Sequence, residues 1–210
     1  MTATGGEIMT GPGSAHDVGF GPYTVLDLHE LPEDGKGFEL EDGWLIEVAA
    51  GSRHTWAARN LSRIIEAAAT RFGAAVTVCD GGEWEINTPA GIRKPDIFVI
   101  PREVARAVII DESPKVIPGR EVLLAVEVVS PGGSSERNDR VRKVGEYAAV
   151  GISQYWIVDH HPSPRVQVLK LGEHGYTATT AVIAGMTLTS EIEADKSFEV
   201  SFDPAALLEF

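Results

Sequence analysis

The sequence predicts an α/β fold in which helices flank a mixed central β-sheet and extra β-hairpins extend it. Residues 122–131 form an apolar run, VLLAVEVVSP, of the kind found in strands that are buried on both faces. Residues 52–72 and 134–150 instead repeat apolar residues at helical spacing. Asp-Gly pairs between apolar segments, as at Asp42-Gly43, indicate hairpins. This mixture of strand and helix signals along the chain is typical of an α/β protein.

Composition and charge limit the classes of protein to which the chain can belong. Its 210 residues are 43% hydrophobic, so they can bury a sizeable core. The formal net charge of -13 excludes a broadly basic surface for nucleic acid, although a local basic patch stays compatible with it. The single cysteine, Cys79, excludes an intrachain disulfide and a Cys-rich zinc site, so we expect a cytoplasmic location. No run approaches the roughly 20 apolar residues of a membrane span, so we expect no membrane association.

The chain is expected to form a single domain over residues 22–210. No linker-like stretch divides this region. Residues 1–21 are rich in glycine and lack the apolar segment of a signal peptide. We therefore expect residues 1–21 to form a flexible N-terminal arm.

Turn and cap residues mark the expected elements in the first half of the chain. Thr24 and Asp27 fit a capping box for a short helix that ends near Pro32. For the helix over 52–72, Ser52 is the expected N-cap and Gly73 the expected end. The other expected elements are a hairpin over 38–48, a second hairpin over 75–86, a strand over 93–100, and a helical turn over 103–107 followed by a loop.

In the second half, strands over 122–131 and 153–159 enclose the helix over 134–150, for which Gly151 is the expected C-cap. Such a β-α-β unit places its helix over the sheet. A hairpin over 165–180 and a short terminal helix over 204–208 complete the prediction.

Glu127 is the one charged residue of the apolar run, and it needs a cationic partner, because removing an unpaired carboxylate from water is costly. Asp96 stands where the expected strand over 93–100 changes from polar to apolar residues. Pairing of the two strands would bring both carboxylates to one site, where they repel each other unless a cation lies between them. A hard divalent ion such as Mg²⁺ or Mn²⁺ prefers such oxygen ligands and promotes phosphodiester hydrolysis.

These residues resemble motifs of the PD-(D/E)XK nuclease superfamily, namely Pro95-Asp96 and the EVVSP segment at 127–131. In particular, the chain is similar to the family of proposed restriction endonucleases of the Uma-two type, formerly a domain of unknown function. The matching pieces form an ordered set between about residues 23 and 176. They also include Leu31-Pro32, the hairpin at 38–43, His54, a Lys and a Tyr on the helix after Glu127, and YWIVD at 155–159.

The resemblance implies a restriction-endonuclease-like fold and a Mg²⁺- or Mn²⁺-dependent endonuclease that hydrolyses phosphodiester bonds of DNA. It implies that Asp96, Glu127 and the backbone carbonyl of Val128 bind the metal ion. Because cleavage of both strands needs two sites, a homodimer is the expected assembly.

The catalytic lysine departs from the superfamily pattern, since Val129 occupies its usual position two residues after the glutamate. The resemblance implies that Lys143 on the following helix replaces it, assisting water and phosphate, with Tyr147 on the same helical face. Accessory roles are expected for Glu39, His54, Arg140 and Tyr147.

Structural interpretations stand beside these functional ones. Glu127 could pair with an arginine, and Lys143 could be a solvated residue that Asp139 neutralises in a surface ion pair. Arg93 and Lys94 could steer phosphate or solvate a strand end. Core or scaffold roles suit Tyr147, Trp156 and Asp159.

The functional alternative is a catalytically inactive nuclease-fold module that binds a partner or nucleic acid. The net charge of -13 and the valine at position 129 favour it. Two small clusters carry no site: His160-His161 lacks further ligands at zinc spacing, and Gly132-Gly133 lacks the P-loop signature.

Overall fold

The computed structural model describes residues 21–48, 50–81, 84–112, 116–130, 132 and 134–210, with the backbone alone described at 134 and 135. The expected flexible arm over 1–21 lies, apart from Gly21, outside the described residues. The assignment of residues 22–210 to one domain stays a prediction.

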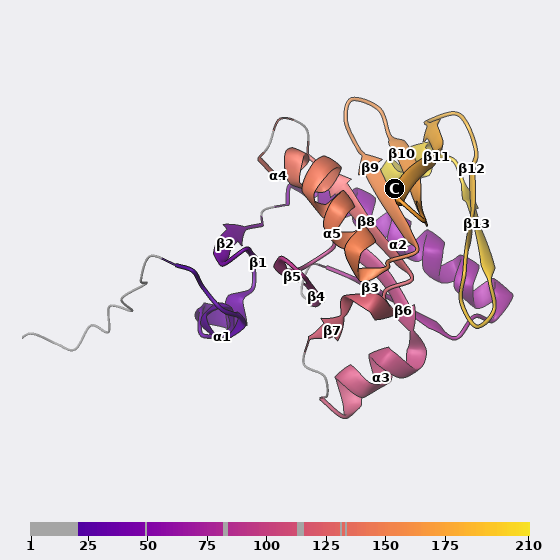
Figure 1. Ribbon diagram of the computed structural model, residues 1–210. Coiled ribbons are helices and arrows are strands. Elements are labelled where there is room, and N and C mark those ends of the chain that lie inside the picture. The colour runs from indigo at the N-terminus through magenta and orange to yellow at the C-terminus, as the bar shows by residue number, and fades with distance from the viewer. Residues whose placement is uncertain (1–20, 49, 82–83, 113–115, 131, 133) are drawn as a thin grey trace, which may run out of the picture.

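A six-stranded mixed sheet forms the centre of the protein, as predicted (Figure 1). The apolar run supplies its strand β8, which runs parallel to β9 and antiparallel to β6. In spatial order the strands are β11 (Gly175–Ile183), β10 (Arg165–Gly172), β9 (Gln154–Asp159), β8 (Leu124–Val129), β6 (Ile97–Pro101) and β3 (Val76–Asp80).

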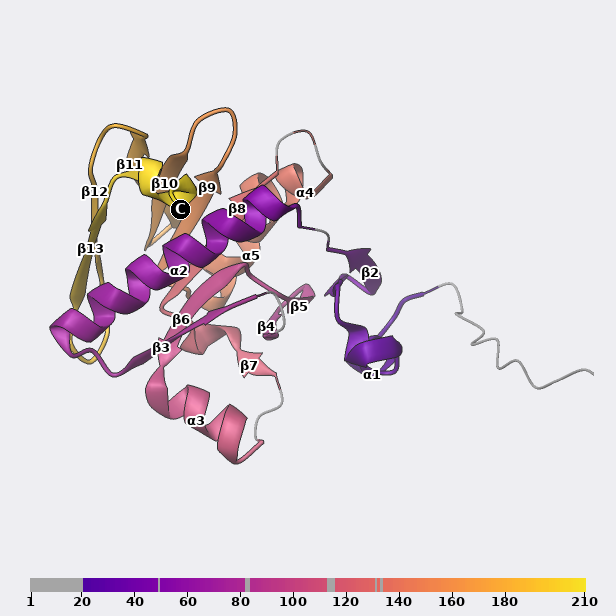
Figure 2. The same cartoon turned by 180° about the vertical axis from the view of Figure 1, so that it is seen from behind.

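The two predicted long helical segments cover opposite faces of this sheet. The long helix α2 (Ser52–Phe72) crosses the face that Figure 2 shows, and α5 (Lys143–Val150) lies on the face that Figure 1 shows. A hairpin of β12 (Leu188–Ile192) and β13 (Phe198–Phe202), which was not predicted from the sequence, packs beside α2. The expected terminal helix is a 3-10 helix over Pro204–Leu208.

Side chains of β8 alternate between two hydrophobic cores, because successive residues of a strand face opposite sides. Val126 and Val128 pack in the core beneath α2. Ala125 and Val129 pack in the other core, beneath α5. All six residues of β8 are buried, and the alternation directs Glu127 toward the α5 side.

A second, smaller sheet lies against the α5 side and carries the N-terminal elements. The predicted hairpin over 38–48 forms two of its strands, and the capping box of Thr24 and Asp27 begins the short helix α1 (Val25–His29), as predicted. In spatial order the strands are β2 (Trp44–Glu47), β1 (Phe38–Glu41), β5 (Gly91–Arg93), β4 (Ile86–Thr88) and β7 (Ile117–Pro118).

The segment after β8 is helical from residue 134 to residue 150, as predicted, but it contains a π-turn. The helix α4 (Ser134–Arg137) is followed by a π-helical turn over Asn138–Arg142, and α5 then continues to Val150. Gly151 ends the helix in the left-handed conformation, with φ of 86°. A π-turn rotates the residues before it relative to those after it.

The hairpin predicted over residues 75–86 is wrong. Strand β3 pairs with β6 in the large sheet, whereas β4 pairs with β5 and β7 in the small one. The Asp80-Gly81 signal marks a change of sheet, because the strands before and after it pair with different partners. A turn signal identifies a bend but not the strand that follows it.

Three further expectations need correction. The strand predicted over 93–100 is two strands, β5 and β6, in different sheets, and Asp96 lies between them. The N-cap of α2 is Gly51 and not Ser52, which is the first helical residue. The expected turn over 103–107 is the longer helix α3 (Arg102–Ile110), whose Ala105 is buried against the sheet.

Candidate functional site

Glu127 is held by two donors from α5. Its Oε1 accepts hydrogen bonds from Lys143 Nζ at 2.9 Å and from the hydroxyl group of Tyr147 at 2.8 Å. Lys143 and Tyr147 are four residues apart, so they project from one face of the helix onto the strand below. The cationic partner that the buried carboxylate requires is therefore a lysine, and the arginine alternative is wrong.

Lys143 is not a solvated surface residue, since only 3% of it is exposed. Besides Glu127, its ammonium group contacts Glu39 Oε1 at 3.2 Å and Asp139 Oδ1 at 3.3 Å. Burial disfavours its charge, but the three carboxylates outweigh burial and hold the pKa of Lys143 well above its usual value. Lys143 is therefore a protonated cation at neutral pH.

Asp139 reaches this cluster from the π-turn. The residue is buried, and the hydroxyl group of Tyr155 donates to its backbone carbonyl at 2.7 Å. The expected ion pair with Lys143 exists, but its position on the surface was wrong, because the π-turn directs Asp139 inward. Arg140 lies outside the cluster and pairs with Glu136 at 3.1 Å and with Asp159.

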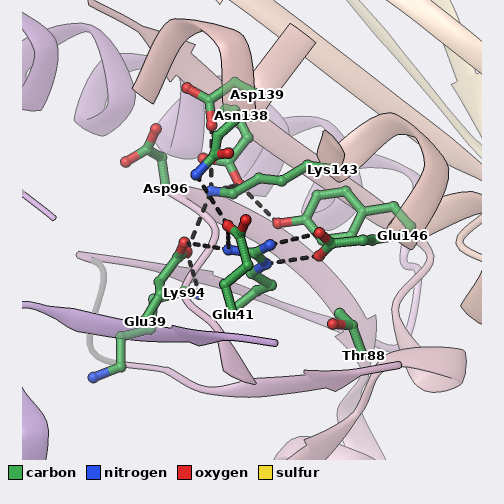
Figure 3. A network of polar contacts seen from close by, with 12 residues as sticks. Glu39, Glu41, Thr88, Lys94, Asp96, Asn138, Asp139, Lys143 and Glu146 are labelled. Carbon is green, nitrogen blue, oxygen red and sulfur yellow. Dashed lines mark hydrogen bonds and ion pairs between the residues drawn. The ribbon is translucent and has the colours of Figure 1, made fainter. Parts of the chain in front are cut away.

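A second charged cluster lies beside the first and centres on Arg93, which is completely buried. Its guanidinium group contacts Glu39 at 3.2 Å, Glu41 at 2.9 Å and Glu146 of α5 at 2.5 Å. Burial lowers the pKa of Arg93, but Glu146 and Glu39 together raise it above its usual value. Figure 3 shows the two clusters joined through Glu39.

Arg93 and Lys94 were expected either to steer phosphate or to solvate a strand end, and both interpretations are wrong. Lys94 is also buried, and its backbone NH donates to Glu39 Oε1 at 2.8 Å. Its ammonium group bonds to the carbonyl of Gly35 at 2.9 Å and contacts Glu85 at 3.3 Å. Partners that are distant in the sequence thus keep both side chains inside the protein.

Asp96 lies at the edge of this network (Figure 3). The antiparallel pairing of β6 with β8 aligns Ile97 with Val126, so Asp96, which immediately precedes β6, lies next to Glu127. Asp96 Oδ2 accepts a hydrogen bond from the backbone NH of Val128 at 2.7 Å. Its side chain is 21% exposed, compared with 4% for that of Glu127, so Asp96 marks the open side of the site.

His54 on the first turn of α2 contacts Asp96, with Nε2 at 3.1 Å from Oδ2. Burial lowers the pKa of His54, but Asp96, Asp139 and the backbone of Val128 together raise it above its usual value. Of the predicted residues, the structure thus brings His54 to Asp96, and Glu39, Lys143 and Tyr147 to the cluster around Glu127. Arg140 remains at the edge, in pairs with carboxylates.

The cluster contains more carboxylates than cations. Burial raises the pKa of Glu127 well above its usual value, and the nearby carboxylates Asp139, Asp96 and Glu39 reinforce this effect, whereas Lys143 opposes it. Burial, together with Asp96 and Glu39, also raises the pKa of Asp139, and Lys143 again opposes the effect. Within the described part of the chain, no three His, Cys, Asp or Glu side chains are arranged as a preformed metal site.

Residues 25–202 match the model of the Uma2 family, described as "Putative restriction endonuclease". The chain belongs to this family. The crystal structure of a protein described as a "putative nuclease belonging to DUF820", from Anabaena variabilis ATCC 29413, is similar to the Uma2 chain with a TM-score of 0.54 and 16% sequence identity. The match covers 79% of this chain and 86% of that one.

The fold of this Uma2 protein is therefore restriction-endonuclease-like, as the sequence predicted. No curated protein matches the chain. None of the helices within the described residues is both long and apolar enough to cross a membrane.

Three features of the site were not predicted from the sequence: the inward position of Asp139, the Arg93 cluster and the placement of His160. The spacing of Asp139 and Lys143 predicts an ion pair, but it does not reveal whether that pair faces the solvent or the sheet. No sequence signal links Arg93 to Glu146, because they belong to different elements. His160, which follows β9, lies edge-on to His54, with ring centroids 6.1 Å apart.

Proposed function

We propose that the protein is a Mg²⁺- or Mn²⁺-dependent endonuclease that hydrolyses phosphodiester bonds of DNA, with Asp96, Glu127 and Lys143 as its catalytic residues. The observation that carries the proposal is the buried Lys143–Glu127 pair beside the partly exposed Asp96. Membership of the Uma2 family supports it. Val129 occupies the position on β8 where the superfamily has its lysine. In this proposal Lys143 of α5 takes the place of that lysine.

The donor set fits a hard divalent ion. Asp96, Glu127 and the carbonyl of Val128 offer oxygen ligands, and Mg²⁺ in proteins commonly uses one or two carboxylates and keeps several waters. Lys143 and Tyr147 both bond to Oε1 of Glu127, so neither of them uses Oε2. The surplus of carboxylates over cations also favours a positive ligand. When bound, the ion would polarise the phosphoryl group and acidify a bound water.

The protein's own residues fix the acidic groups and supply positive charge. The backbone NH of Val128 and the ring of His54 orient the Asp96 carboxylate. Lys143 is protonated, so it does not act as a general base; it orients Glu127 and supplies positive charge toward the phosphate. The scissile phosphodiester enters from the exposed side of Asp96.

Assembly and location follow from the same proposal. A homodimer would provide the two sites that double-strand cleavage requires. The free, buried thiol of Cys79 supports a cytoplasmic location.

A plasmid-nicking assay with Mg²⁺ or Mn²⁺ tests the proposal. The wild type should nick and linearise supercoiled DNA, and Glu127→Gln should reduce the rate at least about a hundredfold, since it removes a charge that acts in the transition state. Glu199→Gln on β13 is the matched control, because Glu199 is exposed on the hairpin beside α2. Metal-dependent cleavage that survives in Glu127→Gln would contradict the site.

The alternative is a catalytically inactive module that binds a partner or nucleic acid. The net charge of -13 favours it, because long-range repulsion opposes the approach of DNA. An inactive wild type on DNA and RNA, with either metal ion, would support this alternative.

A further inference from the structure

The N-terminus of α2 lies beside Asp96 and has no capping side chain. Gly51 is the N-cap and makes no side-chain hydrogen bond to the helix, and the first turn contains no acidic residue. Ser52 and Arg53 of this turn are exposed. The first backbone NH groups of a helix point outward along its axis and favour an anion, here at the start of a 21-residue helix.

A second observation at the same place points to a ligand. Among the described residues, three buried side-chain nitrogen atoms have no hydrogen-bond partner: Nδ1 of His54 and both ring nitrogens of His160. Each histidine is only 8% exposed. Buried polar groups without partners are uncommon in native proteins, and their presence together indicates a missing partner.

His160 lies directly against the first turn of α2. Arg53 Nε donates to the backbone carbonyl of His160 at 3.1 Å, and the His160 ring meets that of His54 at an interplanar angle of 85°. His161 and Arg165, which follow β9 and begin β10, are exposed nearby along the chain. Two carboxylates lie near the two histidines. Asp96 contacts His54, and Asp159, which precedes His160, is paired with Arg140.

We propose that the first turn of α2 and His160 form a binding site for a backbone phosphate of the polynucleotide, next to the phosphodiester at Asp96. This inference rests on the proposed function. Arg53, the helix NH groups and an imidazole NH are all donors, so their common ligand is an anion. In the proposed complex the exposed Arg53 contacts the phosphate, and the unpartnered ring of His160 supplies a further donor.

Binding of a short fluorescein-labelled DNA duplex tests the proposal. Ca²⁺ replaces Mg²⁺ to prevent cleavage, and anisotropy is measured at several salt concentrations for wild type, Arg53→Gln and Arg71→Gln. Arg53→Gln should weaken binding about tenfold and lower the salt slope by about 0.9, the value for one lost phosphate contact. Arg71→Gln removes the same charge from the exposed far end of α2 and should bind like wild type.

His160→Phe separates a ligand-binding role from a structural one. Phenylalanine removes the two unpartnered nitrogens, so the variant should melt at the same temperature as wild type or higher. The proposal expects it to bind the duplex several-fold more weakly nevertheless. Unchanged binding by a folded His160→Phe, or by Arg53→Gln, would overturn the proposal.

Inorganic phosphate provides the remaining comparison. If phosphate raises the melting temperature of wild type but not of Arg53→Gln, while duplex binding is independent of Arg53, the site accepts a free anion and the polynucleotide assignment is wrong. If wild type binds the duplex through Arg53 yet does not cut it with Mg²⁺ or Mn²⁺, the endonuclease proposal fails and this site stands. If Arg53→Gln cleaves DNA with the KM and the salt slope of wild type, the endonuclease proposal stands and the proposed phosphate site is wrong.

Discussion

Lys143 carries one positive charge and contacts three carboxylates, those of Glu39, Glu127 and Asp139. In this environment the ammonium group has two roles. It compensates buried negative charge, and it orients Glu127 within the proposed catalytic site. Its effect on stability can therefore be measured whether or not cleavage is detected.

Substitution Lys143→Met should lower the free energy of unfolding by about 3–5 kcal/mol, because it leaves buried carboxylates without a cation. Urea denaturation followed by circular dichroism measures the loss. Lys170→Met, at an exposed position of β10, is the control and should change little. A loss below about 1 kcal/mol in Lys143→Met would indicate an interaction no stronger than a surface pair.

Addition of Glu127→Gln to Lys143→Met should restore part of the lost stability, because it removes one of the uncompensated charges. A double-mutant cycle measures this coupling, and residues in direct contact typically show roughly 0.5–3 kcal/mol. Strictly additive losses would contradict a direct Lys143–Glu127 interaction.

Cys79 provides a test at a residue outside the site. Burial, aided by the charge of Asp80, raises the pKa of its thiol to about 12 from 9.0. Because the folded state retains the proton more strongly, this contribution to stability is complete below pH 9 and is lost as the pH rises toward 12. The native thiol should resist iodoacetamide at pH 9 and react once urea unfolds the chain. Equal rates in both states would contradict the burial of Cys79.

At the scale of elements, helix α5 and strand β9 each contribute a tyrosine to the region below the helix. The rings of Tyr147 and Tyr155 meet edge-to-face, with centroids 5.1 Å apart. Their hydroxyl groups have different acceptors: Tyr147 donates to the Glu127 carboxylate, and Tyr155 to the backbone carbonyl of Asp139. The pair thus compares a charged acceptor with a neutral one in nearly the same surroundings.

Tyr147→Phe should lower the free energy of unfolding by about 1.5–3 kcal/mol, and Tyr155→Phe by about 0.5–1.5 kcal/mol, because hydrogen bonds to charged groups are stronger. Urea denaturation of both variants measures the difference. Tyr147→Phe should also reduce kcat more than KM if Glu127 is catalytic. The reverse order of stability would mean that the bond to Glu127 contributes little.

The elements that the sequence predicted correctly have local causes. The capping box at Thr24, the left-handed glycines at 73 and 151 and the uninterrupted apolar run of β8 are all set by neighbouring residues. The π-turn could not be predicted, because the same sequence fits a regular helix equally well. It depends on tertiary contacts of Asn138 with Glu41 and of Tyr155 with Asp139.

At the scale of the whole molecule, buried charge joins the small sheet to the large one. Arg93 of β5 contacts Glu146 of α5, and Glu39 of β1 contacts Lys143. These partners are far apart in the sequence, so no local pattern could reveal them. For the same reason Arg93 and Lys94 were expected at exposed positions, where charged residues usually lie.

Arg93→Met should loosen the small sheet. It leaves Glu39, Glu41 and Glu146 without their shared cation, and breaking such a buried pair costs about 3–5 kcal/mol. Hydrogen exchange should show lower protection in β1 and β5 than in β8. Arg120→Met is the control, because that side chain is 75% exposed. Equal loss of protection in both sheets would mean that they unfold together.

The proposed lysine and the proposed metal-binding glutamate belong to different elements, so the proposed catalytic site is complete only when the 134–150 helix is docked on the sheet. A chain with the sheet formed and the 134–150 helix detached would hold Asp96 and Glu127 but lack the cation that orients them. Under the proposed function, a chain whose 134–150 helix is not docked would not cleave DNA. Docking of the 134–150 helix would therefore control the proposed activity.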